Sequence, residues 1–286
     1  YYYVSDMDLF DSNIYAKGAL VLNMLRQILG YDAFWRAVRN YAKEYQHKNV
    51  ESQDLKRIFE DVTGQNLEWF FDQWVYTAGL PELEIKYKYN RRNEHVKLTV
   101  KQTQKVENSS LFRLPLTVLI DNGEIIRQEI WIEEEESTFL IPSIRNPNMV
   151  LVDEGHIIPK RMKFDKKHPE LMYQAKNAPH ILDRIWAIEQ LADHPHKKSI
   201  ENTLVFSLKN DPFYGVRIAA ATALGEYEPR NGGEILMNSI DRQDNRVKRA
   251  CIRSLRNYKG TKIRNFLLNT IMNSDNDYLV NDAYNT

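Results

Sequence analysis

The sequence has little cysteine, no excess of charge and no long apolar run, and each absence narrows what the protein can be. Cys251 is the one cysteine, so the chain forms neither an internal disulfide nor a zinc site built from cysteines. Lysine plus arginine and aspartate plus glutamate both total 39. This balance argues against nucleic acid as the main partner, because phosphate binding needs a basic excess. No apolar stretch approaches the ~20 residues of a membrane helix, so no membrane span is expected.

The composition is that of a folded chain with more than one domain. Hydrophobic residues make up 43% and charged residues 27% of the sequence, which are ordinary globular values. The length of 286 residues exceeds the roughly 150 typical of one domain. The sequence starts at Tyr1 and stops at Thr286 partway through a repeated helix, so we expect a piece of a longer protein. The sequence does not fix the cellular compartment. The protein is cytoplasmic or, if a signal peptide lies upstream, periplasmic or extracellular.

Residues 1–81 have the apolar spacing of helices. Asp11-Ser12 predicts the start of a first helix, whose apolar stripe runs from Ile14 to Ile28 and which Gly30 ends. Three further helices are predicted to begin at polar capping residues: Asp32, Ser52 and Asn66. Gly79-Leu80-Pro81 ends the helical segment, because proline lacks the backbone donor that the next turn needs.

The apolar period changes from helical to alternating at Glu82. Residues 82–89 alternate strictly between polar and apolar, as a half-buried strand does, and similar segments recur to about residue 153. Asp121-Asn122-Gly123 predicts a hairpin turn between two of them. Several short strands separated by turns predict a small antiparallel β-sandwich over residues 82–158. The polar, lysine-rich stretch 159–169 is expected to be a linker.

Residues 165–286 contain a repeat. Positions 183, 216, 247 and 279 are equivalent, with steps of 33, 31 and 32 residues. Small residues follow four positions later, at Ala187, Ala220, Cys251 and Ala283, and leucines eight positions later, at Leu191, Leu224 and Leu255. This pattern predicts a helical solenoid. The steps are shorter than the ~40–47 residues of standard HEAT units, and the ankyrin and TPR consensus residues are missing, so short HEAT-like repeats fit best.

The helical segment also carries a set of specific residue types at specific spacings. The set consists of Tyr15-Ala16-Lys17-Gly18, Leu25-Arg26, Leu29-Gly30, Phe34, Tyr41, Asp54, Phe59, Gly64, Phe71, Trp74, Gly79 and Pro81. It is similar to the segment that follows the zinc site in the M1 family of zinc aminopeptidases (gluzincins). The resemblance implies a multidomain α and β protein. Residues 1–81 would be the helical remainder of a thermolysin-like catalytic domain, followed by the antiparallel β-sandwich and the HEAT-like α-solenoid.

The resemblance further implies a metallo-aminopeptidase that removes N-terminal residues from peptides. In the family, the tyrosine of the Tyr-x-Lys-Gly motif, here Tyr15, assists peptide-bond hydrolysis. A phenol protonated at neutral pH can donate a hydrogen bond to the oxyanion that forms on the attacked carbonyl. Zinc would polarise that carbonyl and activate the attacking water. Tyr15 is therefore the candidate catalytic residue.

The family's zinc-binding elements are absent from this sequence. The His-Glu-x-x-His helix, its downstream glutamate ligand and the Gly-x-Met-Glu-Asn substrate loop all precede the tyrosine in the family. We therefore expect the zinc site of the full-length protein to lie upstream, no metal or cofactor ligand within this chain, and no activity of this chain alone. The alternative is a non-catalytic, aminopeptidase-like scaffold for protein–protein interaction. The retained Tyr15 and Lys17-Gly18 favour the enzyme.

Four other features have simpler structural interpretations. His194 and His196 could approach a metal, but a solvated loop at a helix end is the simpler interpretation. Cys251 lies at the small-residue position of a repeat and is expected to pack in the core. Glu133–Glu136 is expected to be a solvated strand end that discourages edge pairing. Five basic residues of one repeat could dock an acidic partner or form an ordinary solvated surface: Arg246, Lys248, Arg249, Arg253 and Arg256.

Overall fold

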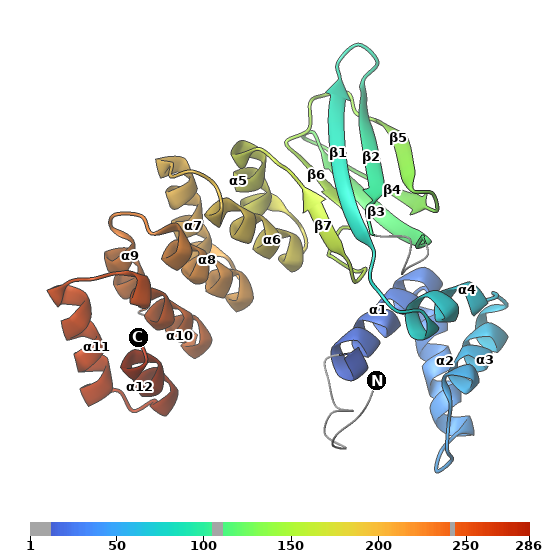
Figure 1. Cartoon of the computed structure of the whole chain (residues 1–286), viewed down its shortest axis with the longest axis horizontal. Coiled ribbons are helices and arrows are strands. Elements are labelled where there is room, and N and C mark those ends of the chain that lie inside the picture. The colour runs from blue at the N-terminus through green and yellow to red at the C-terminus, as the bar shows by residue number, and fades with distance from the viewer. Residues whose placement is uncertain (1–12, 105–110, 241–243) are drawn as a thin grey trace. The chain divides into compact units, whose positions relative to one another are not determined.

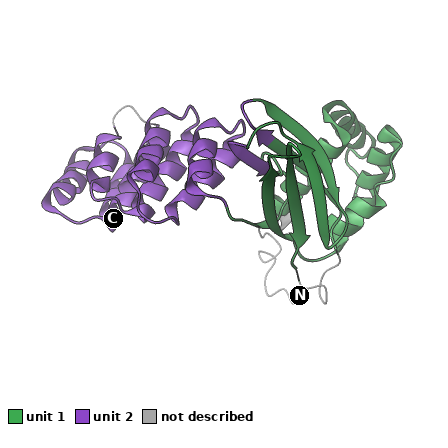
Figure 2. Cartoon of the chain, turned by 90° about the horizontal axis from the view of Figure 1, so that it is seen from above, with its two compact units in different colours: residues 1–119, 124–146, 152–165 green, residues 120–123, 147–151, 166–286 purple. Residues whose placement is uncertain are grey.

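A computed structural model describes residues 13–104, 111–240 and 244–286, and the chain divides into two compact units (Figures 1 and 2). The first unit runs to residue 165 and contains the helical segment and most of the sandwich. The second contains residues 166–286 together with two short stretches, 120–123 and 147–151. The helical segment and the sandwich thus share one compact unit, and the repeats form the body of the other.

The helical segment has the four predicted helices. Its elements are η2 (Asn13–Lys17), α1 (Gly18–Leu29), α2 (Tyr31–Glu44), α3 (Ser52–Thr63), α4 (Glu68–Phe71) and η3 (Asp72–Tyr76). Gly30 and Gly64 end their helices at positive φ angles of 81° and 68°, and the first of these confirms the helix end predicted at Gly30. The predicted cap Asp11-Ser12 lies outside the described residues.

The predicted starts of the three later helices are one or two residues off. Leu67, and not Asn66, is the N-cap of α4. Gly30 is the N-cap of α2, so Asp32 lies in its first turn instead. Glu51 is the N-cap of α3, where its backbone N–H donates to the Asp54 carboxylate at 2.9 Å. An acidic residue three positions after the cap completes such a box. The sequence pattern identifies the correct turn of the helix but not its first residue.

The β-sandwich consists of two sheets. Its strands are β1 (Glu82–Asn90), β2 (His95–Gln102), β3 (Leu114–Asp121), β4 (Ile125–Ile132), β5 (Glu136–Pro142), β6 (Met149–Val152) and β7 (Arg161–Phe164). One sheet has the order β5-β2-β1-β7 and the other β4-β3-β6. The predicted turn follows β3, where Gly123 has a φ of 102° and donates its N–H to the Asp121 carboxylate at 2.9 Å.

The prediction that residues 159–169 form a linker is wrong, because part of this stretch is a strand. Arg161–Phe164 forms β7, which pairs in parallel with the start of β1, so the first sheet is not wholly antiparallel. Lys160 is buried and paired with the buried Asp153. Lys166 is buried and donates to Gln174 Oε1 at 2.8 Å. Lys166 also pairs with the Glu170 carboxylate at 3.1 Å. These two lysine side chains are therefore enclosed, because each has a carboxylate partner that compensates its charge.

The helical segment is tied to the sandwich inside the first unit. The Trp74 and Phe112 rings are 5.5 Å apart, and both are buried. The Gln73 amide accepts from the Arg113 backbone N–H at 2.7 Å and donates to the Arg113 carbonyl at 3.1 Å. The Arg113 guanidinium lies 4.8 Å from the Trp69 ring centroid and 4.6 Å from that of Trp131. Apolar and cation–π contacts together join these two parts.

The repeats are pairs of helices, as predicted. The pairs are α5 (His168–Asn177) with α6 (Ile181–Ala192), α7 (Lys198–Asn210) with α8 (Tyr214–Tyr227), α9 (Gly232–Asn238) with α10 (Asn245–Ser254), and α11 (Thr261–Asn273) with α12 (Asp277–Tyr284). All the predicted repeat positions fall on the second helix of a pair or at its end, and all are at most 9% exposed. Neighbouring second helices pack on one another. One core runs through the first three pairs, and a second, smaller cluster of Ile252, Leu279 and Ala283 joins α10 to α12.

Arginines add a polar element to this repeat. Arg184 and Arg217 occupy the same position, 33 residues apart, and each donates to two carbonyls just before its helix. Arg184 also pairs with Asp211 at 2.8 Å, which links one repeat to the next. Within the described part of the chain, no helix is long and apolar enough to cross a membrane.

Candidate active-site residues

Tyr15 lies on η2, a single π-helical turn that leads directly into α1. The residue is 65% exposed. Single π-turns within helices often occur at functional sites, because the extra residue changes where a side chain points. The candidate phenol is therefore presented to the surroundings from the start of a helix.

The opposite face of α1 fixes the position of this turn. Val21, Met24 and Leu25 are buried, in agreement with the predicted stripe, whereas Leu20, which the stripe also included, is exposed. Gly18 follows Tyr15 by three residues, and a Cβ built on it would meet no heavy atom within 4 Å. Leu22, one further helical turn away, is also exposed. Val21, Met24 and Leu25 thus anchor the helix, and Tyr15 is exposed at its start.

No metal ligand set accompanies Tyr15 within the described residues. Among them, no group of three or more histidine, cysteine, aspartate or glutamate side chains is arranged to hold a metal ion. A catalytic zinc needs three protein ligands. The described residues therefore do not fit the zinc that the family resemblance implies.

The two loop histidines pack against aromatic side chains. His196 stacks on Tyr227 with ring centroids 4.4 Å apart, and His194 meets His168 edge-on at 6.2 Å. The Tyr227 hydroxyl donates to the Pro195 carbonyl at 3.0 Å. Burial, followed by the nearby charge of Lys197, lowers the pKa of His168. These contacts confirm a loop at the end of α6, which is held by packing rather than fully solvated.

Cys251 and the glutamate run also have the simple structural roles predicted for them. Cys251 is buried among the repeat helices, and burial raises the pKa of its thiol to about 12. A thiol with so high a pKa is no nucleophile at neutral pH. Glu133–Glu136 is exposed and leads into β5, the edge strand of its sheet.

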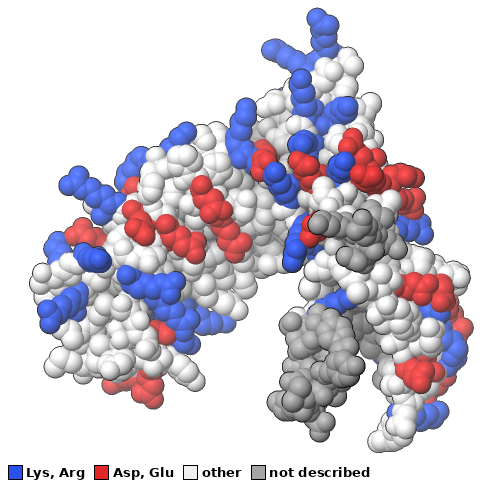
Figure 3. Space-filling view, in the orientation of Figure 1, with Lys and Arg blue, Asp and Glu red and all other residues white. Residues whose placement is uncertain are grey.

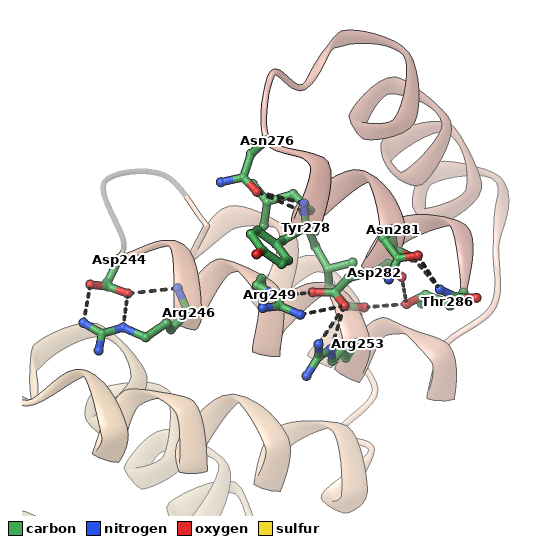
Figure 4. Close-up of polar contacts among 12 residues, drawn as sticks. Asp244, Arg246, Arg249, Arg253, Asn276, Tyr278, Asn281, Asp282 and Thr286 are labelled. Carbon is green, nitrogen blue, oxygen red and sulfur yellow. Dashed lines mark hydrogen bonds and ion pairs between the residues drawn. The ribbon is translucent and has the colours of Figure 1, made fainter.

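The basic cluster on α10 is organised by carboxylates that sequence reasoning missed. Arg249 and Arg253 both pair with the buried Asp282 of α12, at 2.6 and 2.8 Å (Figure 4). Arg246 forms a bidentate pair with Asp244 and lies 3.4 Å from the Tyr214 ring centroid. Asp282 follows Arg249 by 33 residues, one repeat length, which is the signal that could have identified the pair.

Comparisons with known proteins agree with the fold. Residues 4–74 match the peptidase family M1 domain, and residues 169–256 match HEAT repeats. A Caenorhabditis elegans puromycin-sensitive aminopeptidase is 24% identical over 194 residues, 65% of this chain and 20% of that protein. Tricorn protease-interacting factor F2 of Thermoplasma volcanium is 27% identical over 131 residues, 44% of this chain and 16% of that protein.

A solved structure extends the match to almost the whole chain. The structure of Legionella pneumophila aminopeptidase A in complex with aspartic acid superposes with a TM-score of 0.78 at 16% identity, over 98% of this chain and 40% of that one. At this identity the superposition shows a shared fold. The chain spans well under two thirds of the length of these relatives. The matched M1 segment, the HEAT repeats and these aminopeptidase relatives therefore agree with the resemblance to the M1 family that the sequence motif indicates.

Proposed function

We propose that this chain is part of a zinc metallo-aminopeptidase that removes N-terminal residues from peptides, and that Tyr15 acts in the reaction. The observation that carries the proposal is the Tyr15-Ala16-Lys17-Gly18 motif on an exposed helical turn, within the segment that matches the M1 domain. A non-catalytic scaffold would not use the phenol hydroxyl in any chemical step. The zinc, which supplies Lewis acidity when bound, would be held by residues outside this sequence.

The role proposed for Tyr15 follows from its chemistry. Attack on a peptide carbonyl places negative charge on its oxygen, and a phenol O–H aimed at that position donates a hydrogen bond to it. The donor is useful only if its position is fixed before the reaction. The packed face of α1, with Val21, Met24 and Leu25, supports such a fixed position. Tyr15 then stabilises the transition state more than the bound peptide.

Tyr15→Phe in the full-length enzyme tests this role. The substitution removes one hydroxyl and leaves the ring, so the fold and the zinc content should not change. Loss of one oxyanion donor costs ~10²–10³ in kcat. We expect a fall of this size with little change in KM, measured on amino-acid aryl amides with zinc content determined in parallel. Turnover within about threefold of wild type would remove Tyr15 from the mechanism, because an oxyanion donor contributes far more than that.

The 286-residue chain by itself should neither retain zinc nor cleave amino-acid aryl amides. The reason is that the described residues offer no set of three ligands. Elemental analysis of the purified, tag-free chain measures this directly. One tightly bound zinc per chain would contradict the proposal that the zinc site lies elsewhere in the protein, and it would leave the test of Tyr15 unaffected.

A further inference from the structure

The second helices of three consecutive repeats line two adjoining hollows. One, of about 390 Å³, lies between α8 and α10, and the other, of about 460 Å³, lies between α6 and α8. Both are lined by Ile218, Thr222 and Glu226 of α8. The hollows therefore form one groove that crosses α6, α8 and α10, which we call the second-helix groove.

The two ends of this groove carry opposite charge. Glu189 lines the end at α6, and Glu226 of α8 lines both hollows, between Glu189 and the arginines. Four arginines line the other end: Arg246, Arg249 and Arg253 of α10, and Arg256 of the short 3-10 helix η4 (Leu255–Asn257) that follows it. In the space-filling view of the repeats, acidic and basic side chains also gather in separate patches (Figure 3). The rest of the lining includes apolar residues, among them Ile185 of α6 and Ile218 and Ala219 of α8.

Internal ion pairs hold the arginines in place without cancelling their charge. Arg249 and Arg253 share the one carboxylate of Asp282, so that pairing leaves a positive charge. Burial disfavours the charged form of Asp282, but hydrogen bonds from the two arginines outweigh it and keep the pKa of Asp282 below its ordinary value. Arg256 is exposed and has no ion-pair partner among the described residues. The α10 end is thus a prearranged set of guanidinium groups of the kind that binds carboxylates.

We propose that the second-helix groove binds an extended segment of a partner protein that carries glutamate or aspartate at one end and lysine or arginine at the other. Its carboxylates meet the arginines of α10, and its cations meet Glu189 and Glu226. Its middle residues lie over the apolar floor formed around Ile218 and Ala219. Such a surface selects its partner by the order of charges along the chain.

The spacing of the helices sets the length of the segment. Packed helices lie ~8–10 Å apart, so the distance from α6 to α10 is roughly 16–20 Å. An extended chain advances ~3.3 Å per residue and needs about five or six residues to cover it. A small phosphate would fill only the arginine end. A nucleic acid, charged along its whole length, would be repelled by Glu189 and Glu226.

Fluorescence anisotropy with labelled peptides tests the proposal on the 286-residue chain. The probe has two lysines, four apolar residues and two glutamates, and is made in both chain directions. Comparison ligands are the same peptide with glutamines in place of all charges, a peptide with the glutamates alone, single-stranded RNA, and inorganic phosphate as a competitor. We expect the mixed-charge peptide to bind tightest in one of its two directions, and to weaken as salt is raised.

Two variants and one matched control locate the binding. Arg256→Glu should weaken the mixed-charge peptide by about tenfold or more, because a charged hydrogen bond is lost and a repulsion is added. Glu226→Lys should weaken it too, but should strengthen binding of the glutamate-only peptide. Lys209→Glu makes the same charge change at an exposed position of α7 outside the groove and should have little effect. Thermal unfolding shows whether each variant is folded.

Three results would overturn the proposal. The first is that none of the peptides binds. The second is that Arg256→Glu and Lys209→Glu weaken binding equally, which would indicate a general charge effect. The third is that RNA or phosphate binds more tightly than the mixed-charge peptide. None of these outcomes depends on Tyr15 or on catalysis, so the test is separate from that of the proposed function.

Discussion

Helix α1 of the M1 segment and helix α8 of the repeats are both apolar, but they are covered to different degrees. On α8, Val216, Ala220 and Leu224 are fully buried, because α6 and α10 pack on either side of that helix. On α1, Met24 and Leu25 are equally buried, yet Leu22 is 40% exposed. Apolar spacing identifies the faces of a helix that can be buried, whereas the packing of neighbouring helices decides which of those faces are buried.

The largest expected difference between the two helices is in the cost of removing a leucine side chain. Leu224→Ala leaves a cavity in the core of the repeats and should cost about 2–5 kcal/mol of stability. Because the two units need not unfold together, the measurement is amide hydrogen exchange resolved by peptide. Protection should fall in α6, α8 and α10 and stay unchanged in α1. An equal loss of protection in both units would contradict the division into independent cores.

A glycine substitution tests how closely the repeat helices approach one another. A Cβ on Gly225 would lie 2.8 Å from the Ser254 Cβ of α10, closer than real contacts allow. Gly225→Ala should therefore cost about 1–3 kcal/mol, although alanine is the better helix former. In the background of Ser254→Gly, the same substitution should cost much less. A double-mutant cycle by thermal unfolding measures this coupling, and strict additivity would count against the close approach.

The Asp282 pair predicts how the last repeats respond to acid. Its pKa in the folded chain is lowered from the ordinary value of 3.8, since Arg249 and Arg253 favour the carboxylate despite its burial. Its contribution to stability is therefore fully present above pH 3.8 and is lost as the pH falls through the lower, folded pKa. Melting temperatures of wild type and Asp282→Asn should differ at pH 6 and converge as the pH falls below the lowered, folded pKa of Asp282, where the carboxylate becomes protonated. A constant difference down to that pH would contradict the pairing.

The smallest expected effect is that of Leu22→Ala on α1. An exposed side chain has little burial to lose, so stability should change by less than about 0.5 kcal/mol. The change in hydrogen exchange of α1 is the measurement, with the buried Leu25→Ala as the matched control. A cost for Leu22→Ala comparable to that of Leu25→Ala would mean that the open face of α1 is covered in solution.

Local patterns predicted most of the architecture, and long-range pairing accounts for most of what was missed. The change of period at Glu82, the Asp121-Asn122-Gly123 turn and the repeat positions are all local signals, and the structure confirms each one. Strand β7 was missed because four residues rich in charge carry little strand signal of their own. Residues 161–164 form a strand because they pair with β1, which lies about eighty residues earlier along the chain.

The candidate site was predictable from the motif rather than from general chemical patterns. The protein has many tyrosines, and helical spacing alone would not separate Tyr15 from the others. The four-residue motif and its resemblance to one family single it out. The reverse holds for the arginines of α10. Their sequence shows a charge cluster, but their arrangement depends on Asp282, which lies one repeat later and only approaches them once the helices stack.

The parallel pairing of β7 with β1 has a mechanical consequence. The chain enters the sandwich at the first residue of β1 and leaves it at the last residue of β7, and these two strands are neighbours. A tension transmitted along the backbone would pull their outer ends in opposite directions along the strand axis. The hydrogen bonds between Glu82–Ile85 and Arg161–Phe164 would then be loaded together, in shear, and not broken one after another. The pairing of β1 with β7 should therefore resist unfolding of the sandwich when the chain is pulled from the helical segment and from the repeats at the same time.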